Sequence, residues 1–300
     1  MYHGIMNVYK EPGYTSHDVV ARLRGILKQK KIGHTGTLDP AAEGVLPVCL
    51  GMGTRLCDML TDRTKTYEAV MLLGMTTDTQ DTTGQVLEDR HHAAMGLEEA
   101  AVTEAVLGFK GDYDQIPPMY SALKVDGKKL YELARAGKEV ERQARQVQIL
   151  EIRVDKVELP RVWMTVTCSK GTYIRTLCHD IGGKLGCGGC MEHLTRTRVD
   201  RFDIKDSLRL DEIERIRDEG GLDTCILPVE TALEGYAGLK VLPEADAFLY
   251  NGNPCFKGQL DAGNGCLDGL EDGLRFRMYD SKGHFVGVYE YQDSRHWWKP

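Results

Sequence analysis

The alternation of hydrophobic and polar positions predicts three elements in the first fifty residues. Residues 5–9 alternate as a short strand. Thr15 or Ser16 then caps a helix, whose apolar face consists of Val19, Leu23, Ile26 and Leu27. The apolar run at 45–50 is too short for its period to distinguish a buried strand from the start of a helix. Both interpretations of that run therefore stay open.

The middle of the chain mixes strand-like and helix-like segments. Strands are expected at 67–73, 85–87, 146–157 and 161–168, the last two joined through a turn at Leu159 and Pro160. Helices are expected at 97–107, 128–136, 172–185 and 211–218. Consecutive prolines at 117 and 118 impose an extended path, so the segment 115–120 cannot be regular. The pattern predicts a mixed α/β (α+β) domain.

The pattern changes near the C-terminus. After about residue 235 it consists of short strands separated by turns rich in Gly, Asp and Asn. Residues 276–279 and 285–291, joined by D-S-K-G, have the pattern of a hairpin. We therefore expect a boundary near 232–238, with a larger domain over 1–234 and a small β-rich domain over 235–300.

Composition indicates a soluble globular protein. The chain has 300 residues, of which 42% are hydrophobic and 28% charged. Its N-terminus lacks the layout of a signal peptide, and no apolar stretch approaches the length of a membrane span. A cytoplasmic location and no membrane association are expected. The nine cysteines are odd in number and irregularly spaced, which favours reduced thiols over a disulfide framework.

One cysteine pair has the spacing of metal ligands. Cys187 and Cys190 are separated by two glycines, and His179 and His193 are near them in the sequence. A structural zinc site normally has a second closely spaced pair, which the sequence lacks. Free thiols in a glycine-rich turn are the favoured interpretation, and no metal is expected.

The net charge of −7 counts against nonspecific nucleic-acid binding by the whole surface. The segment 124–145, however, has seven basic residues and four acidic ones. Such a run is usually the solvated face of a helix, and a locally basic surface on an acidic protein is the alternative. Charge alone does not decide between them.

Four separated segments draw on the same residue types, namely glycine, a small hydroxyl residue, an aromatic residue and a charged residue. They are H-T-G-T-L-D-P from His34, K-T-Y from Lys65, P-M-Y-S-A-L-K from Pro118 and K-G-T-Y-I-R from Lys170. Asp39 paired with Arg175 would be a carboxylate that a guanidinium keeps ionised. Tyr67 and Tyr173 each offer a flat face for a base and a hydroxyl for proton transfer. A lone carboxylate can attack an anomeric carbon, although turn, capping and core roles remain the alternatives.

The order of these segments resembles the TruB family of tRNA pseudouridine synthases. The matching motifs are K-E-P-G-Y-T-S-H-D-V-V, G-H-T-G-T-L-D-P-A-A-E-G-V-L, K-T-Y-E-A-V-M-L-L-G, P-P-M-Y-S-A-L-K-V-D-G-K-K-L-Y-E-L-A-R and K-G-T-Y-I-R-T-L-C-H-D-I-G. The resemblance is strong over about 1–205. The tail F-R-M-Y-D-S-K-G-H-F-V-G-V-Y-E-Y is more weakly similar to a PUA-like domain. Five motifs in one order are far more specific than any single motif.

The resemblance implies a pseudouridine synthase fold, with a curved and largely antiparallel sheet, that forms pseudouridine-55 in the T-loop of tRNA. Asp39 would be the nucleophile, with Arg175 as its partner. Tyr67 would stack on the flipped uridine and is a candidate for removing its C5 proton. The substrate-binding residues would be His34, Tyr67, Tyr173 and Leu194. No metal or organic cofactor is implied.

The resemblance also implies an RNA-clamping insertion at about 119–146, whose candidate phosphate contacts are Lys124, Lys128, Lys129 and Arg142. The T-arm of tRNA would be the partner of a monomer that needs no protein subunit. Two departures from the family pattern are Tyr9, where an aspartate is usual, and V-D-R-F at 199–202, where a glycine often precedes the aromatic residue. An RNA-guided synthase of the dyskerin type and a catalytically silent tRNA-binding module are the alternatives.

Overall fold

The structure is a computed structural model that describes residues 1–61, 63–125, 127–265 and 267–300, so Cys266 lies outside the described residues. These residues form two compact units, Met1–Ile226 and Leu227–Pro300. The division falls N-terminal to the position near 232–238 that the composition indicates. No helix in the described ranges is long and apolar enough to cross a membrane. The cysteines in those ranges are free thiols.

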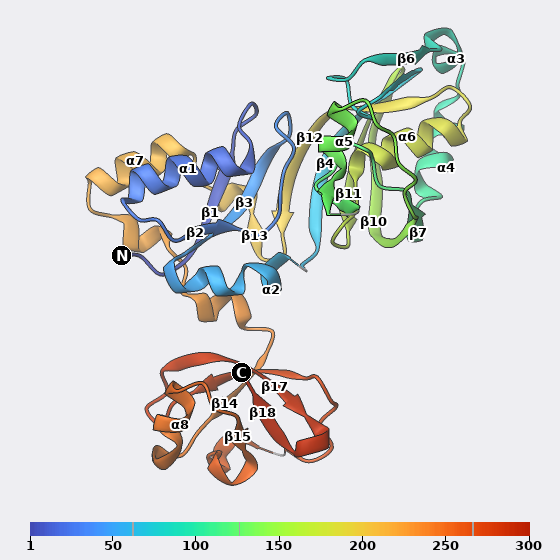
Figure 1. Ribbon diagram of the computed structural model, residues 1–300. Helices are drawn as coiled ribbons and strands as arrows, with labels where there is room; N and C mark the ends of the chain where they lie inside the picture. The colour runs from blue at the N-terminus through green and yellow to red at the C-terminus, as the bar shows by residue number, and fades with distance from the viewer. Residues whose placement is uncertain (62, 126, 266) are drawn as a thin grey trace. The chain divides into compact units, whose positions relative to one another are not determined.

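A curved sheet organises the first unit (Figure 1). Its strands are β1 (Gly4–Lys10), β2 (Ile32–His34), β3 (Glu43–Leu50), β4 (Lys65–Leu73), β7 (Gly111–Gln115), β10 (Arg145–Glu158), β11 (Arg161–Cys168), β12 (Gly189–Val199) and β13 (Phe202–Asp203). The strand order is β1-β3-β12-β4-β11-β10-β7, with β2 paired to β3 and β13 to β12. Only the β3–β12 pair is parallel among the described strand pairs of this sheet. The predicted largely antiparallel sheet is confirmed.

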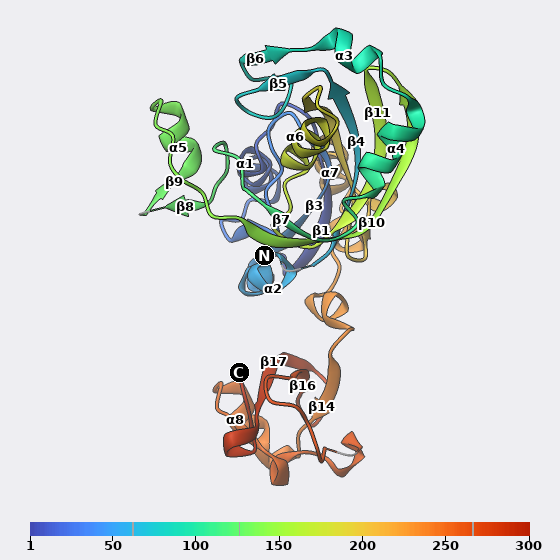
Figure 2. The same ribbon diagram turned by 90° about the vertical axis from the view of Figure 1, so that its right-hand side faces the viewer.

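Two hydrophobic cores pack on this sheet. Helices α1 (Ser16–Leu27) and α7 (Leu210–Asp218) lie side by side and cover β1 and β3. Helices α4 (Glu99–Leu107) and α6 (Ile174–Lys184) share the second core with β4, β10, β11 and β12. Figure 2 shows the sheet curling around α6. The first turn of α1 forms as predicted, because Thr15 and Asp18 make a reciprocal capping box.

The structure resolves the ambiguous run at 45–50 and revises two other segments. Residues 43–50 form a strand whose side chains are almost all buried, which explains an apolar run without a period of two. Lys128 and Lys129, expected in a helix, instead form β9 opposite β8 (Lys124–Val125), and α5 begins only at Leu130 and ends at Arg135. The central strand β12 was not expected from the sequence pattern.

The remaining short elements of the first unit are α2 (Cys57–Thr61), α3 (His91–Met95), and the paired strands β5 (Met75–Thr77) and β6 (Val86–Asp89). The loop between β5 and β6 returns to the sheet, because Met191 of β12 donates its backbone N–H to the carbonyl of Gln80 at 3.0 Å. Gln80 adopts a left-handed backbone conformation, with φ of 62°. This loop therefore has a fixed place beside β12.

The described residues of the second unit form a five-stranded sheet, the α-helix α8 and several short 3-10 helices. Its elements are β14 (Ala237–Lys240), α8 (Asp246–Tyr250), β15 (Cys255–Phe256), β16 (Arg275–Tyr279), β17 (Phe285–Gln292) and β18 (Trp297–Lys299), in the strand order β14-β16-β17-β18-β15. The expected hairpin is present as β16–β17. Trp298, which is 1% exposed, anchors the core. The unit is β-rich as predicted, and its PUA-like character stays a prediction.

Asp280 organises the β16–β17 turn and makes the second unit sensitive to acid. Its carboxylate accepts hydrogen bonds from the Tyr250 hydroxyl at 2.7 Å and from the backbone N–H groups of Lys282 and His284 at 2.9 and 2.8 Å. Burial alone would raise the pKa of Asp280, but these hydrogen bonds outweigh it and hold the pKa well below 3.8. The ionised carboxylate therefore stabilises the folded unit.

We expect Asp280→Asn to destabilise the second unit at neutral pH. Because the folded-state pKa is depressed, the stabilisation is fully present above the ordinary pKa of 3.8 and is lost as the pH falls through the folded-state value. Urea unfolding followed by tryptophan fluorescence, with Trp297 and Trp298 as the reporters in this unit, should give a difference from wild type that persists at about pH 5 and shrinks below about pH 4. The range below about pH 5 is the informative one, because the His284 ring, whose Nδ1 lies 2.9 Å from Oδ2 of Asp280, is then protonated throughout. Asp268→Asn, at an exposed position, is the control. A difference that grows as the pH falls below about 4 would contradict the prediction.

Candidate active site

The loop between β2 and β3 holds Asp39 through several backbone contacts. The Leu38 N–H donates to the hydroxyl of Ser16 at 2.9 Å, which ties the loop to the start of α1. On the other side, the Gly13 N–H donates to the Pro40 carbonyl at 2.8 Å. Ala42 N–H donates to the carbonyl of Asp39 itself at 3.1 Å, which closes a turn. The Asp-Pro turn is present, and its surroundings fix the position of the aspartate.

Lys10 supports the same loop from inside the unit. Its side chain is fully buried, and its ammonium group donates to the carbonyls of Pro40 at 3.1 Å and Ala42 at 2.5 Å. Burial lowers the pKa of Lys10 to about 8, although the nearby Asp39 opposes the shift. Lys10 contacts the backbone of the loop, which agrees with a supporting role.

Arg175 pairs with Asp39, as the sequence predicts, and the geometry of the pair is bidentate. Its Nε donates to Oδ2 at 2.9 Å and its Nη2 to Oδ1 at 3.2 Å. The arginine side chain is 4% exposed, whereas the aspartate side chain is 39% exposed. The remaining donors are also used, because Nη1 donates to the Thr79 carbonyl and Nη2 to the Tyr120 carbonyl, each at 2.9 Å. The buried cation thus fixes a carboxylate that remains open to solvent.

Asp81 is a second carboxylate near Arg175 that the sequence analysis missed. Its Oδ2 lies 3.9 Å from Nε of Arg175, and its side chain is 13% exposed. Its Oδ1 accepts hydrogen bonds from the hydroxyls of Thr79 at 2.8 Å and Thr83 at 2.6 Å. Asp81 lies in the polar loop T-T-D-T-Q-D-T-T-G, where an aspartate reads as a turn residue. The guanidinium of Arg175 therefore has two carboxylates close to it, those of Asp39 and Asp81.

Tyr67 and Leu194 lie in the same hydrophobic cluster as the residues flanking Asp39. Tyr67 is on β4 and 8% exposed, and Leu194 is on β12 and 6% exposed. Leu38 and Ala42 belong to the same cluster. Burial raises the pKa of Tyr67 to about 12, an effect that the nearby guanidinium of Arg196 opposes. The structure thus brings aromatic and aliphatic side chains together with the segment that carries Asp39.

Tyr173 and His34 precede the two members of the ion pair in the sequence, Tyr173 before Arg175 and His34 before Asp39. Tyr173 directly precedes α6, where its backbone N–H donates to Gln115 Oε1 at 2.7 Å and its carbonyl accepts from Gln115 Nε2 at 3.0 Å. Burial raises the pKa of the Tyr173 phenol. Nδ1 of His34 accepts a hydrogen bond from the Gly36 N–H at 3.3 Å, and burial lowers the pKa of this imidazole. His34 is therefore held as a neutral ring at the start of the Asp39 loop.

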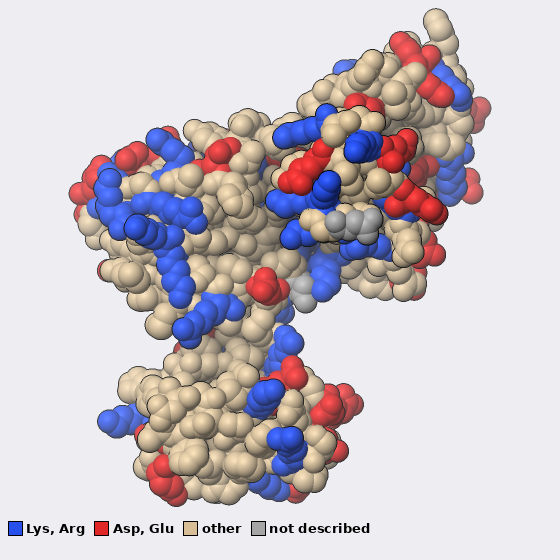
Figure 3. Space-filling model, viewed as in Figure 1, with Lys and Arg blue, Asp and Glu red and all other residues tan. Residues whose placement is uncertain are grey.

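The predicted RNA-clamping insertion projects from the sheet as the β8–β9 hairpin followed by α5 (Figure 2). Lys124 and Lys128 are exposed and Lys129 is half-buried. Figure 3 shows basic side chains over this region, interspersed with acidic ones. Arg142 differs from the lysines, because its side chain is 21% exposed and Nη1 donates to the Pro117 carbonyl at 3.2 Å. Arg142 thus braces the base of the insertion.

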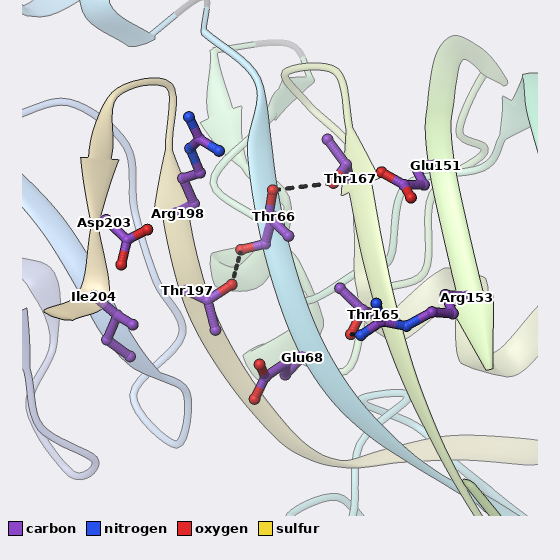
Figure 4. A pocket seen from close by; sticks show the side chains of 10 residues that line it. All are labelled: Thr66, Glu68, Glu151, Arg153, Thr165, Thr167, Thr197, Arg198, Asp203 and Ile204. Carbon is purple, nitrogen blue, oxygen red and sulfur yellow. Dashed lines mark hydrogen bonds between the residues drawn. The ribbon is translucent and has the colours of Figure 1, made fainter. Parts of the chain in front are cut away.

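A polar pocket of about 410 Å³ lies on the opposite face of the sheet (Figure 4). It is lined by Thr66, Glu68, Glu151, Arg153, Thr165, Thr167, Thr197, Arg198, Asp203 and Ile204. Thr66 and Glu68 flank Tyr67 along β4, and successive side chains of a strand point to opposite faces. This pocket is therefore separate from the Asp39 site.

The chemistry that the site offers is nucleophilic and acid–base. A partly exposed carboxylate is held by an arginine, beside a tyrosine and an aliphatic surface. In the described ranges, no three His, Cys, Asp or Glu side chains come together in an arrangement that could hold a metal ion. Cys187 and Cys190, the pair with metal-ligand spacing, are buried thiols whose pKa values burial raises.

Two family models match adjacent parts of the chain. The model described as TruB family pseudouridylate synthase (N terminal domain) matches residues 24–174. The model described as tRNA pseudouridylate synthase B C-terminal domain matches residues 175–234. The first match covers the Asp39 loop, Tyr67 and the insertion, and the second begins at Arg175 and includes β12.

Curated relatives give the same assignment, and two solved complexes share the fold. Proteins named tRNA pseudouridine synthase B are 51% identical in Lachnoclostridium phytofermentans, over 99% of this chain and 98% of the relative, and 46% identical in Clostridium kluyveri, over 95% and 94%. A solved H/ACA RNP bound to a substrate RNA containing 2′-deoxyuridine and a Cbf5–Nop10–Gar1 complex each have a TM-score of 0.72 over 97% of this chain and 78% of theirs, at 26% and 28% identity. A chain that both models match in succession, and that curated members match almost from end to end, belongs to the TruB family of pseudouridine synthases.

Proposed function

We propose that this pseudouridine synthase converts uridine-55 in the T-loop of tRNA to pseudouridine, with Asp39 as the nucleophile. The observation that carries the proposal is the carboxylate of Asp39, which is 39% exposed while Arg175 and the loop backbone hold it in one place. The curated relatives that cover almost the whole chain support tRNA as the substrate. The motif order that the chain shares with the family supports the T-loop uridine.

The geometry fits a reaction on a base that leaves the RNA stack. The target uridine must be extruded, which costs a few kcal/mol of lost stacking. Tyr67 and Leu194 supply aromatic and aliphatic surface that replaces those contacts beside Asp39. Asp39 then starts cleavage of the C1′–N1 bond, and the uracil turns and rejoins the ribose through C5. The C5 proton is lost to a base, for which the oxygen of Tyr67 in its deprotonated form is the candidate. N1 gains a proton in return, and Asp39 ends the cycle as a free carboxylate.

The isomerisation adds and removes no atoms overall. It changes no oxidation state, so the residues of the site and the tRNA are the only participants in the proposal. We propose that the enzyme acts as a cytoplasmic monomer without a protein subunit. The β8–β9 hairpin and α5 would contact the phosphates of the T-arm stem, which gives affinity and register without reading sequence.

The direct test is incubation of the pure protein with an unmodified tRNA transcript, followed by mapping of pseudouridine at single-nucleotide resolution. We expect one modified position, in the T-loop, and the same product with an isolated T-arm stem-loop. The similarity to Cbf5 complexes makes an RNA-guided enzyme the specific alternative. Conversion only after a guide RNA is added would support that alternative, and no conversion under either condition would support a silent binding module.

Reversing charge on the insertion should weaken tRNA binding in a salt-dependent way. In Lys124→Glu/Lys128→Glu, both changes lie at exposed positions of the hairpin. If each lysine contacts one phosphate, the slope of log K against log salt should become shallower by about 0.7–0.9 per contact. Filter binding across a salt series measures this slope. Lys110→Glu, an exposed position after α4, is the matched control. A double variant with an unchanged slope would show that the hairpin does not contact phosphates.

A further inference from the structure

Arg196 lies in the middle of the sheet, between the strand that follows Asp39 and the strand that carries Tyr67. It belongs to β12, which has β3 on one side and β4 on the other. In the register of these strands Arg196 is opposite Gly44 of β3 and Tyr67 of β4. Its side chain is 1% exposed. The buried Arg196 is therefore adjacent both to the strand that follows Asp39 and to the strand that carries Tyr67.

A glycine at position 44 permits this close approach of β3 and β12. Gly44 has φ of 105°, and a Cβ atom there would lie 2.3 Å from the carbonyl oxygen of Arg196. Any other residue would push the two strands apart at the point where Arg196 enters the core. The contact between the two backbones fixes where the arginine side chain begins.

The guanidinium group binds the backbone on both sides of Asp39. Its Nε donates to the Val45 carbonyl at 2.7 Å, after the aspartate. Its Nη2 and Nη1 donate to the carbonyls of Gly36 at 3.3 Å and Thr37 at 3.5 Å, before it. Three donors of one planar group thus hold the two ends of the Asp39 loop at a set separation.

Arg196 also lies beside Tyr67, its partner in the β12–β4 register. Its positive charge opposes the rise that burial causes in the pKa of Tyr67. Burial lowers the pKa of Arg196, yet a guanidinium stays protonated in proteins. No carboxylate in the described ranges forms an ion pair with it. A buried cation without a counter-ion is costly, and an apolar residue would pack there at lower cost.

We infer that Arg196 is a positioning residue, which locks the Asp39 loop to Tyr67 so that the carboxylate and the phenol reach the same uridine in one geometry. This inference rests on the proposed function of Asp39 and Tyr67. The positioning role requires the planar set of donors of a guanidinium. A lysine at this position would keep the positive charge and lose the simultaneous contacts. Arg196 itself does not touch the substrate. Its effect should therefore appear in the rate of conversion and not in the affinity for tRNA.

The test compares Arg196→Lys with Arg198→Lys, a control two residues along β12 whose side chain lines the pocket on the other face. Single-turnover conversion of a T-arm stem-loop and its dissociation constant are measured for each. We expect Arg196→Lys to slow conversion about 100-fold, the cost of a misplacement of about 1 Å, with unchanged affinity. Arg198→Lys should match wild type. A rate for Arg196→Lys near that of wild type, or an affinity that falls in step with the rate, would overturn the inference.

A double-mutant cycle separates positioning from a general loss of structure. If Arg196 acts through Tyr67, Arg196→Lys should slow a Tyr67→Phe enzyme much less than it slows wild type. Equal slowing in both backgrounds, or a fall in the unfolding midpoint large enough to leave Arg196→Lys partly unfolded at the assay temperature, would assign Arg196 a structural role only. If the wild-type protein itself forms no pseudouridine, the proposed function is wrong, and this result is distinct from any outcome for the Arg196 variants.

Discussion

Replacing Asp39 by asparagine should abolish pseudouridine formation and leave tRNA binding nearly intact. The amide has the size of the carboxylate, and its oxygen can still accept a hydrogen bond from Arg175, so the loop should keep its shape. The amide is not a nucleophile at neutral pH, however. We therefore expect the single-turnover rate to fall by at least about a thousandfold, as when a nucleophile is removed from other enzymes.

The position of Asp39 makes this variant informative. The loop is anchored by Ser16, Lys10 and the turn to Ala42, and none of these contacts uses the carboxylate. A loss of activity therefore reports on the carboxylate and not on the fold. The measurements are pseudouridine mapping, a tRNA binding isotherm and a thermal melt. Asp58→Asn, an exposed position on α2, is the matched control. Conversion of the T-loop uridine by Asp39→Asn at a rate near that of wild type would refute the assignment of the nucleophile.

Much of the fold follows from local patterns in the sequence. The capping signal before α1, the period of α6 and the alternation along β11 are each contained within one element, and each element forms close to its expected bounds. The Asp39–Arg175 pair could also be predicted, because two separate motifs with complementary charges suggest a contact. These features do not depend on how the strands pair.

The central strand β12 could not be predicted in this way. Its pairing with β4 contains register shifts between Met191 and His193 and between Arg196 and Arg198, which interrupt the alternation expected of a strand. Its buried face also includes Arg196, a residue type that usually indicates a surface. Asp81 was missed because it stands in a polar loop where an aspartate is an ordinary turn residue. Its contact with Arg175 exists only once the β5–β6 loop packs against β12.

The V-D-R-F segment at 199–202 shows how a departure from the family pattern is accommodated. Asp200, in the turn between β12 and β13, has φ of 50°, a conformation that glycine adopts without strain. Aspartate tolerates this region better than most residues, because its short side chain can bond locally. The turn nonetheless joins β12 to β13 with antiparallel pairing, so the substitution leaves the strand connection in place.

Replacing Arg175 by lysine should cost both activity and stability. The guanidinium binds both oxygens of Asp39 and the carbonyls of Thr79 and Tyr120, so it joins the Asp39 loop, the β5–β6 loop and the start of the insertion. An ammonium group cannot make these contacts at once. We expect conversion to slow by about 10²–10³-fold, the usual effect of losing a preorganised charged contact in an active site.

The loss of stability should be about 2 kcal/mol in the free energy of unfolding, because two part-buried carbonyls and part of a carboxylate lose their donors. Arg161→Lys is a stringent control, since Arg161 binds Glu192 with the same bidentate geometry, at 2.7 and 2.8 Å, at a site where the arginine is 46% exposed. Surface pairs contribute only about 0–1 kcal/mol, so this control should lose little stability and no activity. Urea unfolding and single-turnover assays measure both effects. Equal losses in the two variants would mean that bidentate pairing, wherever it occurs, explains the result. A loss confined to Arg175→Lys would instead tie the effect to the three segments that this arginine joins.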